Sequence, residues 1–155
     1  MNEDALVEYL NKDYKSLSKF YGIFSIDELN FDIPNKSGYL ICNTDESYNT
    51  GKHWVVIFFN KNIKQVEYFD SLGRRPSERL INFMRQDNHY ILYNTKKIQS
   101  SLSDSCGLFC LYLIYFMCRN LDYKSIIDNF SLSVYDNEKH VKKFIKQTFK
   151  QIFIW

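Results

Sequence analysis

The segment that begins at Cys106 constrains the fold of this chain more than any other. A polar, turn-forming stretch, Ile98 to Ser105, ends at Cys106, and an almost unbroken apolar run follows it. This change predicts a buried helix whose first turn carries Cys106. The helix dipole and the free N–H groups at a helix N terminus favour a thiolate over a thiol. The run Leu108 to Cys118 is too short to span a membrane, so we expect it to pack in the core.

Length and composition indicate one globular domain. The chain has 155 residues, which is enough for a substantial core, so we expect a single domain over residues 1–155. The apolar fraction of 45% and the aromatic fraction of 17% argue against disorder. The net charge of +2 neither requires nor excludes a polyanionic partner.

The four cysteines are predicted to be free thiols. Cys106, Cys110 and Cys118 fall on one predicted helix, and cysteines four residues apart on a helix rarely meet the geometry of a disulfide. The amino terminus is polar and acidic, unlike a signal peptide. We therefore expect a reducing compartment and a protein that is neither secreted nor bound to a membrane.

Periodicity predicts an α+β fold, with a central, mostly antiparallel sheet packed against the Cys106 helix. The strand His53 to Asn60 is apolar at both alternating sets of positions, so we expect it to be buried on both faces. Predicted strands cover residues 39–43, 53–60, 65–70 and 90–95, and predicted helices cover 4–10, 76–86, 106–118, 123–129 and 137–153, with one helical turn at 25–28.

Four residues could form an acyl-transfer site. Cys106 is the candidate nucleophile, and His53, at the entrance of a predicted strand, is the candidate general base. Asp70 closes an apolar strand and could orient the imidazole of His53. Gln99 lies shortly before Cys106 and could bind an oxyanion together with the Cys106 backbone N–H.

Each of these four residues also has an ordinary structural interpretation. Cys106 could be a small core residue, His53 a half-exposed strand end, Asp70 the start of a turn and Gln99 a surface loop residue. Their joint occurrence favours catalysis. Structural roles fit the remaining candidates better, namely Cys42, Cys110, Cys118, His89, His140 and Trp54 as a wall beside His53.

The order His53-Trp54, then Asp70 after an apolar strand, then Gln99 and Cys106-Gly107, resembles the adenovirus protease (adenain) family and, more distantly, the SUMO-specific proteases. The resemblance runs from about Phe20 to the last helix. The interval of seven residues between Gln99 and Cys106 is of the adenovirus type. Asp70 departs from that type, which has Glu there, and matches the SUMO proteases. The resemblance implies a papain-like, adenain-like fold and assigns the four catalytic roles above.

The resemblance also implies a function. We expect a thiol hydrolase, a cysteine endopeptidase that cuts capsid or core precursors during particle maturation in a DNA virus or a virus-related mobile element. We expect a monomer that acts inside the virion or the infected cell, in cytoplasm or nucleus, and needs no metal or organic cofactor. The alternatives are an isopeptidase for ubiquitin-like modifiers, an acetyltransferase with the same His–acid–Cys set, and a non-catalytic binding module.

Activators are a further expectation from the resemblance. The adenovirus enzyme is stimulated by DNA and by a viral peptide held through a disulfide to a Cys upstream of its Gln. Here residues 73–98 contain no Cys, which leaves a non-covalent peptide activator open. The lysines of the final helix could bind DNA, although we favour a solvated face on a docking helix; they are Lys142, Lys143, Lys146 and Lys150.

Overall fold

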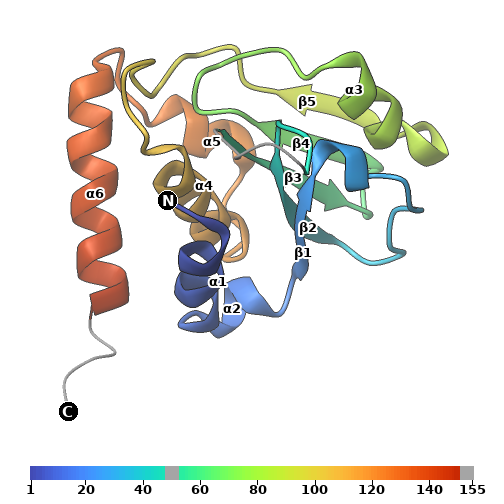
Figure 1. The fold of residues 1–155 in the computed structure, drawn as a ribbon, viewed down its shortest axis with the longest axis horizontal. Helices are drawn as coiled ribbons and strands as arrows, with labels where there is room; N and C mark the ends of the chain where they lie inside the picture. The colour runs from blue at the N-terminus through green and yellow to red at the C-terminus, as the bar shows by residue number, and fades with distance from the viewer. Residues whose placement is uncertain (48–52, 151–155) are drawn as a thin grey trace.

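The structure, a computed structural model, describes residues 1–47 and 53–150 and contains a five-stranded sheet with helices on both faces (Figure 1). The strands are β1 (Phe20–Ser25), β2 (Gly38–Asn43), β3 (Trp54–Asn60), β4 (Gln65–Phe69) and β5 (Tyr90–Tyr93). The helices are α1 (Glu3–Asn11), α2 (Tyr14–Leu17), α3 (Glu78–Met84), α4 (Cys106–Met117), α5 (Tyr123–Asp128) and α6 (Val134–Lys150), with short 3₁₀ turns η1 (Ile26–Glu28) and η2 (Gln86–Asn88).

The strands lie in sequence order, and the sheet is mixed. The pairs β2–β3 and β3–β4 are antiparallel, whereas β1–β2 and β4–β5 are parallel. The predicted α+β class is confirmed, and the predicted antiparallel pairing holds at the centre of the sheet but not at its two edges. One consequence matters for the site: the start of β3 and the ends of β4 and β5 lie at the same end of the sheet.

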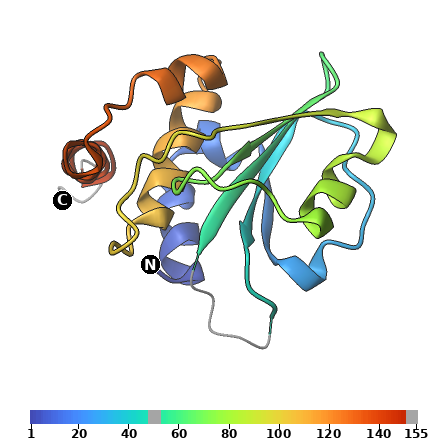
Figure 2. The ribbon, with the colours of Figure 1, turned by 90° about the horizontal axis from the view of Figure 1, so that it is seen from above.

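Strand β3 separates two hydrophobic clusters. Its alternate side chains face opposite sides, as predicted: Trp54, Val56 and Phe58 lie in the cluster under α4, and the intervening three lie in the cluster under α3. Figure 2 shows α3 on one side of the sheet and α1, α4 and α6 on the other. A strand buried on both faces provides a rigid support for whatever stands at its first residue.

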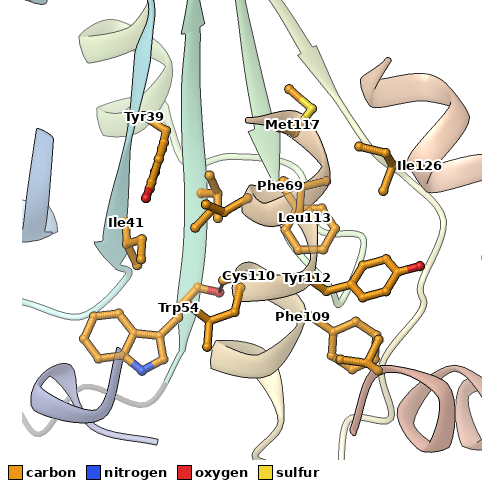
Figure 3. Close-up of a cluster of buried hydrophobic side chains, with 14 of the residues drawn as sticks. Tyr39, Ile41, Trp54, Phe69, Phe109, Cys110, Tyr112, Leu113, Met117 and Ile126 are labelled. Atoms are coloured by element: carbon orange, nitrogen blue, oxygen red, sulfur yellow. Dashed lines mark hydrogen bonds between the residues drawn. The ribbon is translucent and has the colours of Figure 1, made fainter. Parts of the chain in front are cut away.

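Helix α4 is the central element of the larger cluster. It begins at Cys106, as predicted, and nine of its residues are buried. Figure 3 shows Cys110 and Leu113 directed at Trp54 and Phe69 of the sheet, with Phe109 and Tyr112 directed away from it. A helix that is apolar on all sides is stable only where other elements surround it, here the sheet, α1, α5 and α6.

Some elements differ from the prediction. Strand β1 was not predicted because Gly22, at φ 135°, interrupts its apolar pattern and shifts its register against β2. Helix α3 begins at Glu78, two residues after Pro76, because the Ser77 side chain accepts a hydrogen bond from the Leu80 N–H and caps it. The short helix α2 was also not predicted.

The last helix begins at Val134 rather than at residue 137, and its predicted end at residue 153 lies outside the described residues. Val141, Ile145 and Phe149 are buried, whereas Lys142 and Lys143 are exposed. No helix within residues 1–47 and 53–150 is long and apolar enough to cross a membrane. All four cysteines are free and buried.

Candidate active site

The strand ends place His53 beside Asp70. His53 directly precedes β3 and Asp70 directly follows β4, and the antiparallel register pairs Val56 with Phe69. A backbone hydrogen bond of 3.1 Å from the Thr44 N–H to the His53 carbonyl oxygen holds this end of β3 to β2. His53 and Asp70, which are 17 positions apart in the chain, are therefore neighbours at one end of the sheet.

Asp70 holds one nitrogen of the His53 ring. His53 Nε2 lies 2.6 Å from Asp70 Oδ1, and Asp70 is only 2% exposed. The same carboxylate oxygen accepts a hydrogen bond of 2.8 Å from the Leu72 N–H. The two interpretations of Asp70 are thus compatible, because the side chain shapes the turn and binds the imidazole. With Nε2 engaged, Nδ1 is the nitrogen left for a second partner.

Cys106 meets His53 across the interface between α4 and β3. The Cys110 thiol, one helical turn later, donates a hydrogen bond of 3.4 Å to the Trp54 carbonyl oxygen and fixes the helix against the strand. The His53 ring and the backbone N–H groups of Trp54 and Gly107 act on the Cys106 sulfur and together lower its pKa. The structure therefore brings His53, Asp70 and Cys106 together in one row.

The electrostatics of the row favour an ion pair. Burial alone would lower the pKa of His53, but the hydrogen bonds and charges of Asp70 and Cys106 outweigh it and raise that pKa to about 9. Burial alone would raise the pKa of Cys106, but the hydrogen bonds and charge of His53 and the backbone N–H groups lower it. Both shifts favour an imidazolium–thiolate pair, which is the reactive state of a cysteine nucleophile.

Gln99 is buried in the loop that leads into α4. Its Oε1 accepts a hydrogen bond of 2.5 Å from Ser71 Oγ, and its Nε2 donates one of 3.0 Å to the Ser103 carbonyl oxygen. A primary amide has two N–H groups, so the described partners leave one for a further acceptor. Gln99 is 1% exposed, which excludes the surface-loop interpretation. Its role as an oxyanion donor stays a prediction.

Two segments hold the site residues together, and the sequence did not indicate this. The turn after β4 is bonded to the loop after β5, since the backbone N–H groups of Ile98 and Gln99 each donate to the Ser71 carbonyl oxygen at 3.0 Å. Gly73 adopts φ 68° and packs so closely on this loop that a Cβ would lie 2.7 Å from the Thr95 carbonyl oxygen. Asp70 and Gln99 consequently belong to two segments, the turn after β4 and the loop after β5, that are hydrogen-bonded to each other.

Asn94 was predicted inside a strand and is instead the first residue after β5. Its side chain is buried and bonded to the backbone of Asp70. An Asn directly after an apolar strand was the available signal, but its meaning depends on the parallel pairing of β4 with β5, which local pattern does not reveal.

The other two histidines have partners outside the row. His89 is buried and bonded to the Gln86 carbonyl oxygen, and His140 lies 3.2 Å from the hydroxyl of Tyr112. Burial raises the pKa values of Cys42, Cys110 and Cys118, which keeps them as thiols. Across the described ranges, no group of three His, Cys, Asp or Glu side chains is arranged to hold a metal ion. Trp54 donates from its indole N–H to the Met1 carbonyl oxygen at 2.9 Å.

A small cavity of about 170 Å³ adjoins the row on the His53 and Asp70 side. Arg74 and Arg75 also line it, and the Arg75 guanidinium is paired with the Glu78 carboxylate at 3.1 Å. Larger cavities of about 330, 360 and 310 Å³ are also present, and none of these is lined by His53, Asp70 or Cys106. Cavity size alone would therefore point away from the chemistry, and the row is the better guide.

Comparisons with known proteins find relatives among viral proteases. The sequence profile described as Ulp1 protease family, C-terminal catalytic domain, matches residues 39–153. A SUMO-1 cysteine protease of African swine fever virus is 33% identical over 98 residues, which cover 56% of this chain and 36% of the relative. A protease of bovine adenovirus 4 is 28% identical over 110 residues, which cover 62% of this chain and 55% of the relative.

Two solved structures are similar in fold. A crystal structure of the African swine fever virus pS273R protease matches with a TM-score of 0.65 at 19% identity, covering 94% of this chain and 66% of that one. The SUMO protease Ulp1, with its catalytic cysteine oxidised to a sulfinic acid, matches with a TM-score of 0.56 at 12% identity, covering 94% and 74%. This chain spans only 36% of the length of the African swine fever virus relative and 55% of the length of the bovine adenovirus relative. Because the family profile covers most of its length, from the second strand into the last helix, the chain belongs to the Ulp1 protease family of cysteine proteases.

Proposed function

We propose that this protein is a cysteine endopeptidase in which Cys106 attacks the scissile carbonyl carbon. The observation that carries the proposal is the row from Asp70 through His53 to Cys106, with a raised pKa at His53 and a lowered pKa at Cys106. Such a pair has the nucleophile already ionised and the acid already protonated before substrate binds.

In the proposed reaction, the Cys106 thiolate adds to the carbonyl carbon and gives a tetrahedral oxyanion. The backbone N–H of Cys106 and the second N–H of Gln99 would stabilise this oxyanion. Collapse breaks the C–N bond, and the His53 imidazolium gives its proton to the leaving amine. A water molecule, deprotonated by the now neutral His53, then adds to the thioester and releases the carboxylic acid and the thiolate.

The proposed substrates are structural precursors of a virus particle, cleaved inside the virion or the infected cell. Support comes from the relatives, since a bovine adenovirus protease and an African swine fever virus protease both align with this chain. The Arg74 side chain that lines the cavity beside His53 and Asp70 favours substrates that bring an acidic side chain close to the scissile bond.

A second candidate is an isopeptidase for ubiquitin-like modifiers. One specific observation favours it: the acid of the row is Asp70, as in the SUMO proteases that the sequence resembles, and one matched relative carries the name SUMO-1 cysteine protease. The two candidates use the same chemistry and differ only in what the surface around the row recognises.

One experiment separates the two candidates. The purified protein and its Cys106→Ala variant are incubated with denatured particle proteins and with a fusion of SUMO-1 to a fluorescent reporter, and the products are read by mass spectrometry. We expect new internal peptide ends in the particle proteins with the unaltered protein alone. Cleavage of the fusion alone would favour the candidate that acts on ubiquitin-like modifiers, and no new ends in either sample would overturn the proposal.

A further inference from the structure

The side chain of Asn94 is hydrogen-bonded to both the backbone N–H and the backbone carbonyl oxygen of Asp70. Asn94 Oδ1 accepts a hydrogen bond of 3.1 Å from the Asp70 N–H, and Asn94 Nδ2 donates one of 2.6 Å to the Asp70 carbonyl oxygen. Only 5% of Asn94 is exposed. These two hydrogen bonds involve only the backbone of Asp70, so its carboxylate stays available for His53 and for the Leu72 N–H.

The orientation of the Asn94 amide is fixed by its partners. Nδ2 also donates to the Lys96 carbonyl oxygen at 3.2 Å, so both of its N–H groups face carbonyl oxygens. Oδ1 faces the Asp70 N–H and, at 3.1 Å, the hydroxyl of Tyr123. A flipped amide would set Nδ2 against the Asp70 N–H, where no acceptor exists. The amide is therefore fully bonded in one orientation only.

Tyr123 extends this connection to α5. Its single hydroxyl proton faces two acceptors, the Tyr68 carbonyl oxygen at 2.7 Å and Asn94 Oδ1 at 3.1 Å, so one buried donor is shared between β4 and the residue that follows β5. Tyr123 is 4% exposed. Helix α5 thus holds the end of β4 in place, two residues before Asp70, by a polar contact inside an otherwise apolar cluster.

We propose that Asn94 is a positioning residue of the active site and that Tyr123 supports it. The proposal rests on the proposed function of His53, Asp70 and Cys106. An Asp side chain is short, so the 2.6 Å contact with His53 depends on where the Asp70 backbone lies. Asn94 sets that place, and through Asp70 it sets the protonation of His53 and Cys106.

The test is the pH dependence of Cys106 alkylation by iodoacetamide, followed by mass spectrometry of the intact, folded protein. We expect Asn94→Ala to raise the midpoint of thiolate formation at Cys106 by on the order of one pH unit, about a tenfold loss of thiolate at a pH below the midpoint. Tyr123→Phe, which removes only the hydroxyl, should shift the midpoint in the same direction by less. It also keeps the test available if Asn94→Ala fails to fold.

The matched control is Tyr112→Phe. Tyr112 is another mostly buried tyrosine of the same cluster, but its hydroxyl lies beside His140 and is not hydrogen-bonded to Asn94 or Asp70. We expect its alkylation midpoint to match that of the unaltered protein. Unchanged midpoints in Asn94→Ala and Tyr123→Phe, or an equal shift in Tyr112→Phe, would overturn the proposal.

The failure of this proposal is distinguishable from the failure of the proposed function. The alkylation midpoint needs no substrate, so a shift in the Asn94 and Tyr123 variants supports the positioning role even where no peptide is cleaved. Conversely, unshifted midpoints in a protein that cleaves particle proteins would remove the positioning role and leave the protease.

Discussion

The first and second turns of α4 each carry a cysteine, and the pKa values of these two thiols are shifted in opposite directions. Cys106 and Cys110 are one turn apart, and both are buried. Cys106 faces a histidine and two backbone N–H groups, which lower its pKa despite burial. Cys110 is enclosed by apolar side chains, and burial raises its pKa. Burial alone does not decide the state of a thiol; the polar groups that accompany it do.

The largest effect should come from removing the thiol in the first turn. Cys106→Ala deletes the nucleophile and little contact area, so we expect peptide cleavage to be lost entirely while the affinity for substrate is retained. Steady-state kinetics on one cleavable peptide, with binding of the same peptide measured by anisotropy, tests this. Residual turnover above the uncatalysed rate would assign the nucleophile to another residue.

Removing the carboxylate should cost less than removing the nucleophile. Asp70→Asn withdraws the charge that raises the pKa of His53, so the imidazolium–thiolate pair is weakened, and we expect kcat to fall by about 100- to 10,000-fold. Asp70→Glu should keep part of the activity, because the resembling adenovirus enzymes have Glu at this place. Circular dichroism checks that both variants fold. Full turnover in Asp70→Asn would leave Asp70 as a turn residue only.

The oxyanion role of Gln99 predicts a smaller effect again. Gln99→Ala should lower kcat on the order of 100-fold with little change in KM, since the donor acts mainly in the transition state. Gln99→Glu should be at least as harmful because it places a negative charge beside the developing oxyanion. A rise in KM alone would make Gln99 a substrate-binding residue, and the donor would have to be sought elsewhere in the loop.

The smallest effect should follow from changing the thiol in the second turn. Cys110→Ala removes a buried sulfur and its contact with the Trp54 carbonyl oxygen, so we expect a loss of about 1–2 kcal/mol in the free energy of unfolding. The value of kcat should stay within about twofold, because this thiol does not reach substrate. Urea unfolding and peptide kinetics measure the two quantities. A large drop in kcat would mean that the two turns are not independent.

Much of the fold was predictable because local pattern determined it. The start of α4 at Cys106 follows from a sharp change of polarity, and the double burial of β3 follows from its apolar residues at every position. The half-exposed strand β1 has no such pattern, since Gly22 interrupts it and its pairing with β2 is a long-range contact.

The candidate site was predictable as a set of residue types, but its support was not. His53, Asp70 and Cys106 were proposed from order and residue type, and the structure brings them together. Hydrogen bonds join Asn94 to Asp70 and Ser71 to Gln99, and they connect segments more than twenty residues apart. These segments are neighbours because β4 and β5 pair in parallel. No local signal in the sequence specifies that pairing.

The central claim is that the thiol of Cys106 is ionised by its neighbours while that of Cys110 is not. The most direct measurement is the alkylation rate of each cysteine in the native protein between pH 5 and pH 10. Because the pKa of Cys106 is lowered, its thiolate is present above that lowered pKa, so we predict that fast labelling persists below the ordinary thiol value of 9.0 and declines as the pH falls through the lowered pKa. Cys110, with its raised pKa, should remain unlabelled throughout. A Cys106 rate that rises only near the ordinary thiol value of 9.0, or equal labelling of both cysteines at pH 7, would contradict the account.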